Sequence, residues 1–107
     1  MMKPTAYSVV RWSEGGLPDS GRLRQTLIDE HYDVIEWSDN AGTVYEMHFH
    51  LEDQSHWIIS GSLELTIDTG DKFILEPGDR DFMPAGTQHS ARVIGDNAVR
   101  YLIGSRK

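Results

Sequence analysis

Four of the five histidines of this 107-residue chain lie in two short segments, one spanning 48–56 and one ending at His89. His48 and His50 stand two residues apart. Side chains two apart on a β-strand leave the same face, so a strand here would present both imidazoles together. Histidine is the commonest protein ligand for transition metals, and the spacing therefore indicates a metal site. The alternative is a set of ordinary core or surface histidines.

Two longer patterns surround these histidines. Residues 42–61 follow G-x5-H-x-H-x3-E-x6-G, with Gln54 at the Glu position. Residues 78–93 follow G-x5-P-x-G-x2-H-x3-N, with Val93 at the Asn position. The chain thereby resembles the cupin superfamily, of which these are the two motifs. The resemblance implies an all-β fold, the cupin-type double-stranded β-helix or jelly-roll barrel.

The resemblance also implies one divalent metal ion inside the barrel. Four side chains occupy the ligand positions of the family: His48, His50, Gln54 and His89. An amide oxygen binds metal more weakly than a carboxylate, so Gln54 is expected either to bind loosely or to hydrogen-bond a ligand instead. Nitrogen-rich ligation suits Fe, Ni, Cu and Zn, and Mn less well, and the residues do not choose among these metals.

Two further side chains are candidates for catalysis. His56 shares strand parity with Gln54, which would turn it into the barrel as a general acid or base, or as an inward histidine paired with a neighbour. Glu46 shares parity with His48, which would place its carboxylate on the inner face. There it would act as a base or would orient a ligand histidine.

Length and composition limit the other possibilities. The chain fits a single domain over 1–107, with a core barrel over about 32–104 and an N-terminal strand and loop segment over 1–31. The chain has no cysteine, so disulfides and thiolate metal sites are excluded. A formal charge of −7 argues against nucleic acid and anionic membranes as partners. No signal peptide or membrane-spanning apolar run is evident, and a cytoplasmic location is expected.

Short strands at regular spacing, separated by turn residues, predict a sandwich or barrel. Residues 21–30 are ambiguous, because Leu23, Leu27 and Ile28 fit one helical face while alternation fits an edge strand. We expect a strand there, since the remainder is all-β. The other expected strands are 5–12, 32–37, 43–50, 56–60, 62–68, 72–75, 81–83, 89–94 and 99–104.

Strand parity also predicts the outer face of the ligand strand. If His48 faces inward, then Tyr45, Met47 and Phe49 face outward as an apolar patch. Such a patch is usually covered, either by a second subunit or by the chain's own N-terminal segment. We expect a homodimer.

The expected function is that of a metal-dependent enzyme acting on a small polar or sugar-derived molecule, of the isomerase, lyase or dioxygenase type. The His-x-His-x3-Gln pattern resembles small cupins that linearise unsaturated uronic sugars, which use an Asp and an Arg on the last strand. Here the last strand reads VRYLIGSRK and has no acid. The alternatives are a non-catalytic module that binds a small molecule or a metal, and a metal-free relative.

Overall fold

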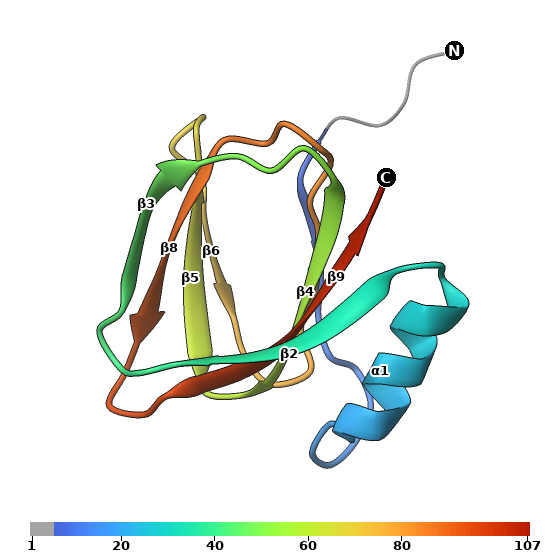
Figure 1. Ribbon diagram of the computed structural model, residues 1–107. Coiled ribbons are helices and arrows are strands. Elements are labelled where there is room, and N and C mark those ends of the chain that lie inside the picture. The colour runs from blue at the N-terminus through green and yellow to red at the C-terminus, as the bar shows by residue number, and fades with distance from the viewer. Residues whose placement is uncertain (1–5) are drawn as a thin grey trace.

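In the described part of the chain, two antiparallel β-sheets face each other, and a single helix lies outside them (Figure 1). The structure is a computed structural model that describes residues 6–107. The first sheet has the order β1 (Ser8–Val10), β7 (Arg80–Phe82), β4 (Asp53–Ser60), β9 (Val99–Arg106) and β2 (Asp33–Asp39). The second has the order β3 (Val44–His48), β8 (His89–Ile94), β5 (Ser62–Ile67) and β6 (Lys72–Leu75). The predicted all-β jelly roll is confirmed.

An apolar core fills part of the space between the sheets. Strand β5 shows the alternation that produces it. Leu63 and Leu65 are each 2% exposed, while Glu64 and the other alternate side chains of the strand are only half-buried. Leu63 and Leu65 pack with Tyr101 of β9 from the opposite sheet. These three side chains also line a cavity, so the core forms one wall of a pocket.

The prediction of a strand over 21–30 is wrong, because this segment forms helix α1 (Ser20–Asp29). Asp19 caps the helix by accepting a hydrogen bond from the Gly21 N–H at 3.0 Å. Leu23 and Leu27, four residues apart, bury their side chains in a second cluster with Trp57 of β4 and residues of β9. The helix thus covers the outer face of the five-stranded sheet, which an edge strand would have left open. Among residues 6–107, no helix is long and apolar enough to cross a membrane.

The N-terminal segment pairs with its own chain. Strand β1 runs antiparallel to β7, with Val9 opposite Asp81. The carboxylate of Asp79 then accepts hydrogen bonds from the Trp12 N–H at 2.8 Å and the Arg11 guanidinium at 2.9 Å. The strand predicted over 5–12 is therefore present as the shorter β1, and residue 5 lies outside the described residues.

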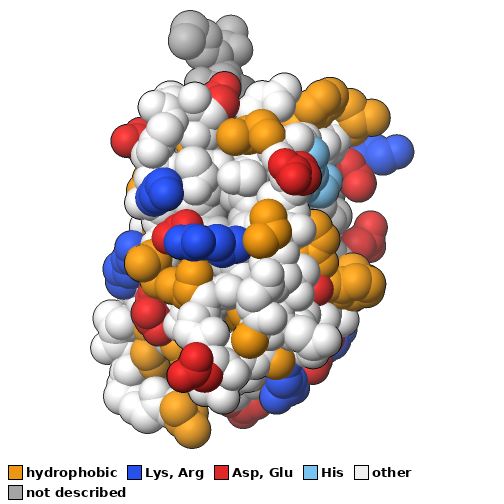
Figure 2. Space-filling view, turned by 90° about the vertical axis from the view of Figure 1, so that its left-hand side faces the viewer, with side chains coloured by type: hydrophobic (Ala, Val, Ile, Leu, Met, Phe, Trp, Pro, Cys, Tyr) orange, Lys and Arg blue, Asp and Glu red, His pale blue; other side chains and the backbone are white. Residues whose placement is uncertain are grey.

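The outer side of β3 carries a different set of large apolar side chains from the one predicted. Met47 is 47% exposed and Phe49, just after the strand, 51% exposed, but Tyr45 turns inward and packs against the core. Val44 is 61% exposed and faces outward in its place. Apolar side chains on this side of the molecule form small groups among charged and polar ones (Figure 2). The homodimer stays a prediction.

Helix α1 offers a test of how it is attached. Leu27 is fully buried, whereas Ile28 on the same helix is 47% exposed. We expect Leu27→Ala to lower the free energy of unfolding by about 2–4 kcal/mol through lost burial and the cavity left behind. The control Ile28→Ala should change it by less than about 0.5 kcal/mol. Urea denaturation followed by tryptophan fluorescence measures both, and equal losses would contradict this packing.

Candidate metal centre

A β-bulge in β3 decides which of its side chains face the barrel interior. Tyr45 lies opposite Ala91 of β8, yet His48 lies opposite His89, so β3 contains one residue more than β8 between these pairs. The extra residue reverses the parity of the strand. Tyr45 and His48 therefore both line the cavity, although they stand three positions apart and would face opposite sides of a regular strand.

The bulge corrects the prediction for Glu46. Its side chain is exposed and is not part of the pocket lining. The Glu46 backbone serves the site instead, because its carbonyl oxygen accepts a hydrogen bond from Nδ1 of His48 at 2.6 Å. The expected carboxylate on the inner face is absent from this position.

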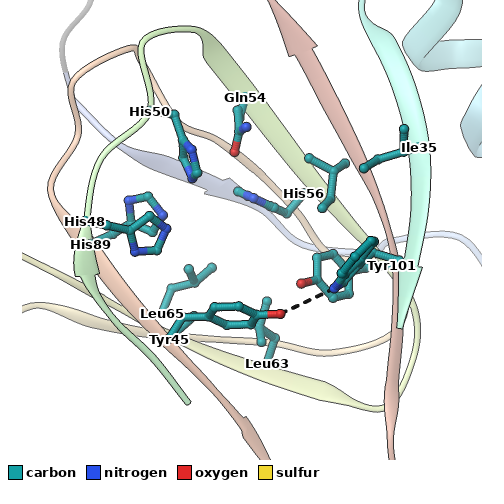
Figure 3. A pocket seen from close by; sticks show the side chains of 13 residues that line it. Ile35, Tyr45, His48, His50, Gln54, His56, Leu63, Leu65, His89 and Tyr101 are labelled. Carbon is teal, nitrogen blue, oxygen red and sulfur yellow. Dashed lines mark hydrogen bonds between the residues drawn. The ribbon is translucent and has the colours of Figure 1, made fainter. Parts of the chain in front are cut away.

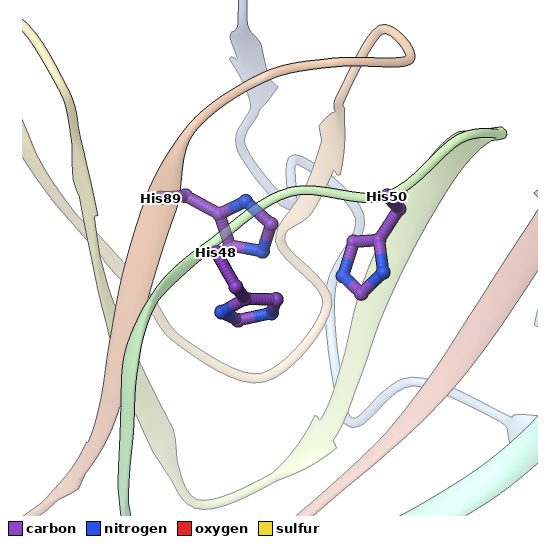
Figure 4. A group of neighbouring side chains, drawn as sticks. All are labelled: His48, His50 and His89. Carbon is purple, nitrogen blue, oxygen red and sulfur yellow. The ribbon is translucent and has the colours of Figure 1, made fainter.

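Three imidazoles meet at one end of the cavity (Figure 4). His48 ends β3, His50 follows in the connection to β4, and His89 begins β8. One nitrogen from each ring lies within 4.8 Å of the others, and the ring centroids of His48 and His89 are 4.3 Å apart. The cluster brings together all three histidines that were predicted as ligands.

Backbone carbonyls fix two of these rings in one tautomer. Nδ1 of His48 lies against the Glu46 oxygen, and Nδ1 of His89 lies 2.9 Å from the Thr87 oxygen. A carbonyl oxygen can only accept, so each Nδ1 carries the proton and each Nε2 keeps a free lone pair. This orientation by an outer hydrogen bond is typical of metal-binding histidines.

The environment also favours the neutral form of His89 and His50. Burial, together with the neighbouring imidazoles, lowers the pKa of His89 to about 4 and outweighs the opposing effect of the Thr87 hydrogen bond. Burial and the nearby His48 and His56 also lower the pKa of His50. Neutral imidazole is the form that binds metal. Three converging imidazole nitrogens are a set that could hold a divalent transition metal.

Gln54 lies beside this cluster on β4 (Figure 3). Its Nε2 donates to Oγ of Ser105 on β9 at 3.2 Å, which leaves the amide oxygen as an acceptor toward the cavity that Gln54 lines. An oxygen in this place could serve as a fourth ligand atom beside the three imidazole nitrogens. Its role as a ligand stays a prediction.

His56 lines the same cavity and is held by a buried carboxylate. Its Nδ1 lies 3.0 Å from both carboxylate oxygens of Asp81, and its backbone N–H donates to one of them at 2.6 Å. Asp81 is fully buried and also accepts from the Tyr7 hydroxyl at 2.7 Å. Burial alone would lower the pKa of His56, but the charge of Asp81 and its hydrogen bond raise it overall.

Sequence reasoning missed Asp81 as a partner of His56. It lies 25 residues away along the chain, and only the pairing of β4 with β7 brings the two together. Its place in the stretch GDRDF, inside a predicted strand, was the one available signal. A charged residue within a strand is more often solvated than buried, so this signal points to no specific partner.

The cavity that joins these groups has a volume of about 260 Å³. The three clustered imidazoles and Gln54 lie at one end, and Tyr45 and Tyr101 lie at the other (Figure 3). Trp37 belongs to the second end, because its indole N–H contacts the Tyr45 hydroxyl oxygen. Leu63, Leu65 and other aliphatic side chains form the wall between them. The site is therefore a small, largely apolar pocket with a few convergent polar groups, which is the usual form of a small-molecule site.

Comparison with known proteins identifies the family. Residues 36–104, more than half of the chain, match the cupin domain family. The chain is a cupin. The predicted family membership is thereby confirmed, and all three clustered histidines lie within the matched range.

Individual cupins that resemble this chain carry out different reactions. It is 28% identical over 97 residues to oxalate decarboxylase OxdC of Bacillus subtilis strain 168, covering 87% of this chain and 25% of the decarboxylase. It is 33% identical over 63 residues to quercetin 2,3-dioxygenase of the same organism, covering 58% of this chain and 18% of the dioxygenase. The solved structure of DMSP lyase DddQ from Ruegeria pomeroyi DSS-3 superposes with a TM-score of 0.65 at 26% identity, covering 71% of this chain and 38% of the lyase.

The chain therefore spans only a quarter or less of the two curated relatives. A decarboxylase, a dioxygenase and a lyase among its relatives show that membership of the family does not fix the reaction. The particular reaction depends on the residues that line the site.

The ligand assignment can be tested by removing one imidazole at a time. We expect His48→Ala, His50→Ala and His89→Ala each to weaken binding of Zn²⁺ or Co²⁺ by at least about 100-fold, the upper end of what loss of an outer partner costs. His31→Asn is the matched control, since His31 is exposed and has a φ of 71°, which asparagine tolerates. Competition with a chelator measures the affinities, and an effect of His31→Asn as large as the others would contradict the assignment.

The lowered pKa of His89 predicts a pH dependence of stability in the metal-free protein. The unfolded histidine titrates near 6.5 and the folded one at about 4, so the unfolded chain binds more protons between these values. This group therefore destabilises the fold as the pH falls from 6.5 toward 4. Urea denaturation of chelator-treated protein should show a shallower loss for His89→Gln than for the wild type. Identical slopes would contradict the shifted pKa.

Proposed function

We propose that this cupin is a metal-dependent isomerase or lyase acting on a small polar, carbonyl-containing or sugar-derived molecule. One observation carries the proposal: the His56–Asp81 pair opens onto the same cavity as the three-histidine cluster. A metal site alone supports binding. A metal site with a proton-carrying group beside it supports chemistry.

His48, His50 and His89 would hold the metal, with Gln54 as the fourth ligand. A divalent ion bound there supplies a Lewis acid that polarises a carbonyl or hydroxyl oxygen of the substrate. Three neutral imidazoles and a neutral amide leave the full charge of the ion in place, whereas a glutamate at position 54 would reduce it. The departure from the cupin motif thus favours Lewis-acid chemistry.

His56 would move the proton. Asp81 accepts the hydrogen bond from Nδ1, which fixes the ring and leaves Nε2 as the group that takes up or releases a proton. Tyr7 and the His56 backbone N–H occupy the same carboxylate, so Asp81 is held in place by three donors. Such a held imidazole can remove a proton next to a carbonyl and return it at a neighbouring atom, as isomerisation requires.

The relatives support an enzyme without choosing the reaction. Oxalate decarboxylase, quercetin 2,3-dioxygenase and DMSP lyase use the cupin fold for distinct chemistry. The placement of His56 and Asp81 favours proton transfer over oxygen chemistry, which would depend on a redox-active metal. Metal content, measured by plasma mass spectrometry on tag-free protein purified without chelator, separates zinc from redox-active metals.

Deuterium exchange tests the proposal before a substrate is known. We expect metal-loaded protein to incorporate deuterium from D₂O next to the carbonyl of small hydroxyketones and keto sugars, as followed by NMR. His56→Gln should lower the rate by about 100-fold or more, the contribution typical of an acid–base group, while His31→Asn should not. Oxygen uptake without exchange would indicate a dioxygenase, and bound metal with neither activity would indicate a non-catalytic binding module.

A further inference from the structure

The end of the cavity opposite the histidines is organised by one carboxylate. Asp39, at the end of β2, accepts the Tyr45 hydroxyl proton at 2.7 Å on one oxygen and the Tyr101 hydroxyl proton at 2.9 Å on the other. The Trp37 indole N–H also points to Asp39, at 3.1 Å, and to the Tyr45 oxygen, at 3.3 Å. Every donor proton of these three aromatic side chains is therefore directed at this network.

This arrangement sets the polarity that a ligand meets. A hydroxyl has one proton, and each tyrosine already uses that proton to donate a hydrogen bond to Asp39. The hydrogen bond to Asp39 and burial raise the pKa of Tyr45, and burial with the same carboxylate raises that of Tyr101, so both protons stay on the tyrosines. The hydroxyl oxygens can then only accept. A ligand group that reaches them must bring a proton of its own.

The pocket also lacks a positive side chain. Among the described residues, no lysine or arginine lines it. Arg100, beside Tyr101 on β9, points outward to Glu36 at 2.8 Å, and the buried Arg80 is held by Glu30 at 2.9 Å outside the cavity. Asp39 adds negative charge at the tyrosine end. A carboxylate or phosphate at that end would be repelled and unpaired, which is costly in an apolar pocket.

We propose that the pocket selects a small, uncharged molecule with an oxygen ligand at the histidine end and a hydroxyl or N–H donor at the tyrosine end. The inference rests on the proposed metal site and narrows its substrate class. It removes carboxylated sugars, such as uronates with the acid directed away from the metal, from the candidates. It retains phenols, enols and neutral polyols with a carbonyl.

Benzohydroxamic acids with different para groups test this polarity, because their common head binds a divalent metal while the para group points down the pocket. The probes are the 4-hydroxy, 4-fluoro and 4-carboxy compounds, and Zn²⁺-loaded protein is titrated by calorimetry. We expect the 4-hydroxy probe to bind about tenfold more tightly than the 4-fluoro probe, because one additional hydrogen bond typically changes the affinity by that factor. The 4-carboxy probe should bind more weakly than both.

Asp39→Asn should reverse the discrimination. The amide NH₂ would donate to one tyrosine, which frees that hydroxyl proton for the ligand and removes the negative charge. The 4-carboxy probe should then gain about tenfold or more, and the advantage of 4-hydroxy over 4-fluoro should fall to about threefold or less. Glu36→Gln is the matched control, since Glu36 lies on the same strand but pairs with Arg100 on the outside. Tyr101→Phe offers a second variant, which should lower the 4-hydroxy preference alone.

The outcomes separate the two proposals. If all probes bind equally to the wild-type protein, the selectivity is wrong while the metal site stands. If the 4-carboxy probe binds best, the selectivity is likewise wrong. If no probe binds to the Zn²⁺-loaded protein, or if zinc itself does not bind, the metal site fails and the selectivity fails with it.

Discussion

The site depends on the close approach of like groups: one nitrogen from each of three imidazoles lies within 4.8 Å of the others, partly shielded from water. Protonation of His50 and His89 is disfavoured, because burial removes hydration from the charged ring and the neighbouring imidazoles lower the pKa further. Two of the rings, His48 and His89, already donate hydrogen bonds from Nδ1 to backbone carbonyls. The favourable way to add positive charge would be one cation shared by Nε2 of His48, Nε2 of His89 and a ring nitrogen of His50. The bulge in β3 and the register of β8 create this arrangement by placing His48 opposite His89.

Two carboxylates outside the metal cluster organise the rest of the pocket. Asp81, fully buried, orients His56, and Asp39 orients Tyr45 and Tyr101. Each acts through its neighbours, because it directs their protons. The two ends of the cavity therefore differ, with converging imidazole nitrogens at one end and hydrogen-bond-accepting hydroxyl oxygens at the other. An apolar wall between the two ends strengthens both effects by excluding water.

The sequence predicted the fold and the grouping of His48, His50 and His89 because period-2 spacing and turn residues are local signals. Residues 89–94 form the predicted strand without any shift of its ends. Local signals could not show the bulge in β3, which turns Glu46 outward and Tyr45 inward. They also could not show partners such as Asp39 and Tyr101, which are 62 residues apart and meet only when β2 pairs with β9. The segment 21–30 forms a helix because Leu23 and Leu27 are then buried against the outer face of the five-stranded sheet. That contact is tertiary, so the local pattern could not reveal it.

Anomalous diffraction from crystals grown with Zn²⁺ or Co²⁺ tests the central claim most directly. We expect one strong anomalous peak, bonded to Nε2 of His48 and His89 and to one ring nitrogen of His50, with His56 held by Asp81 and outside the ligand set. Absence of a peak at saturating metal would contradict the account. So would a peak bonded through Nδ1 of His48 and His89, because both observed carbonyl hydrogen bonds would then have to break.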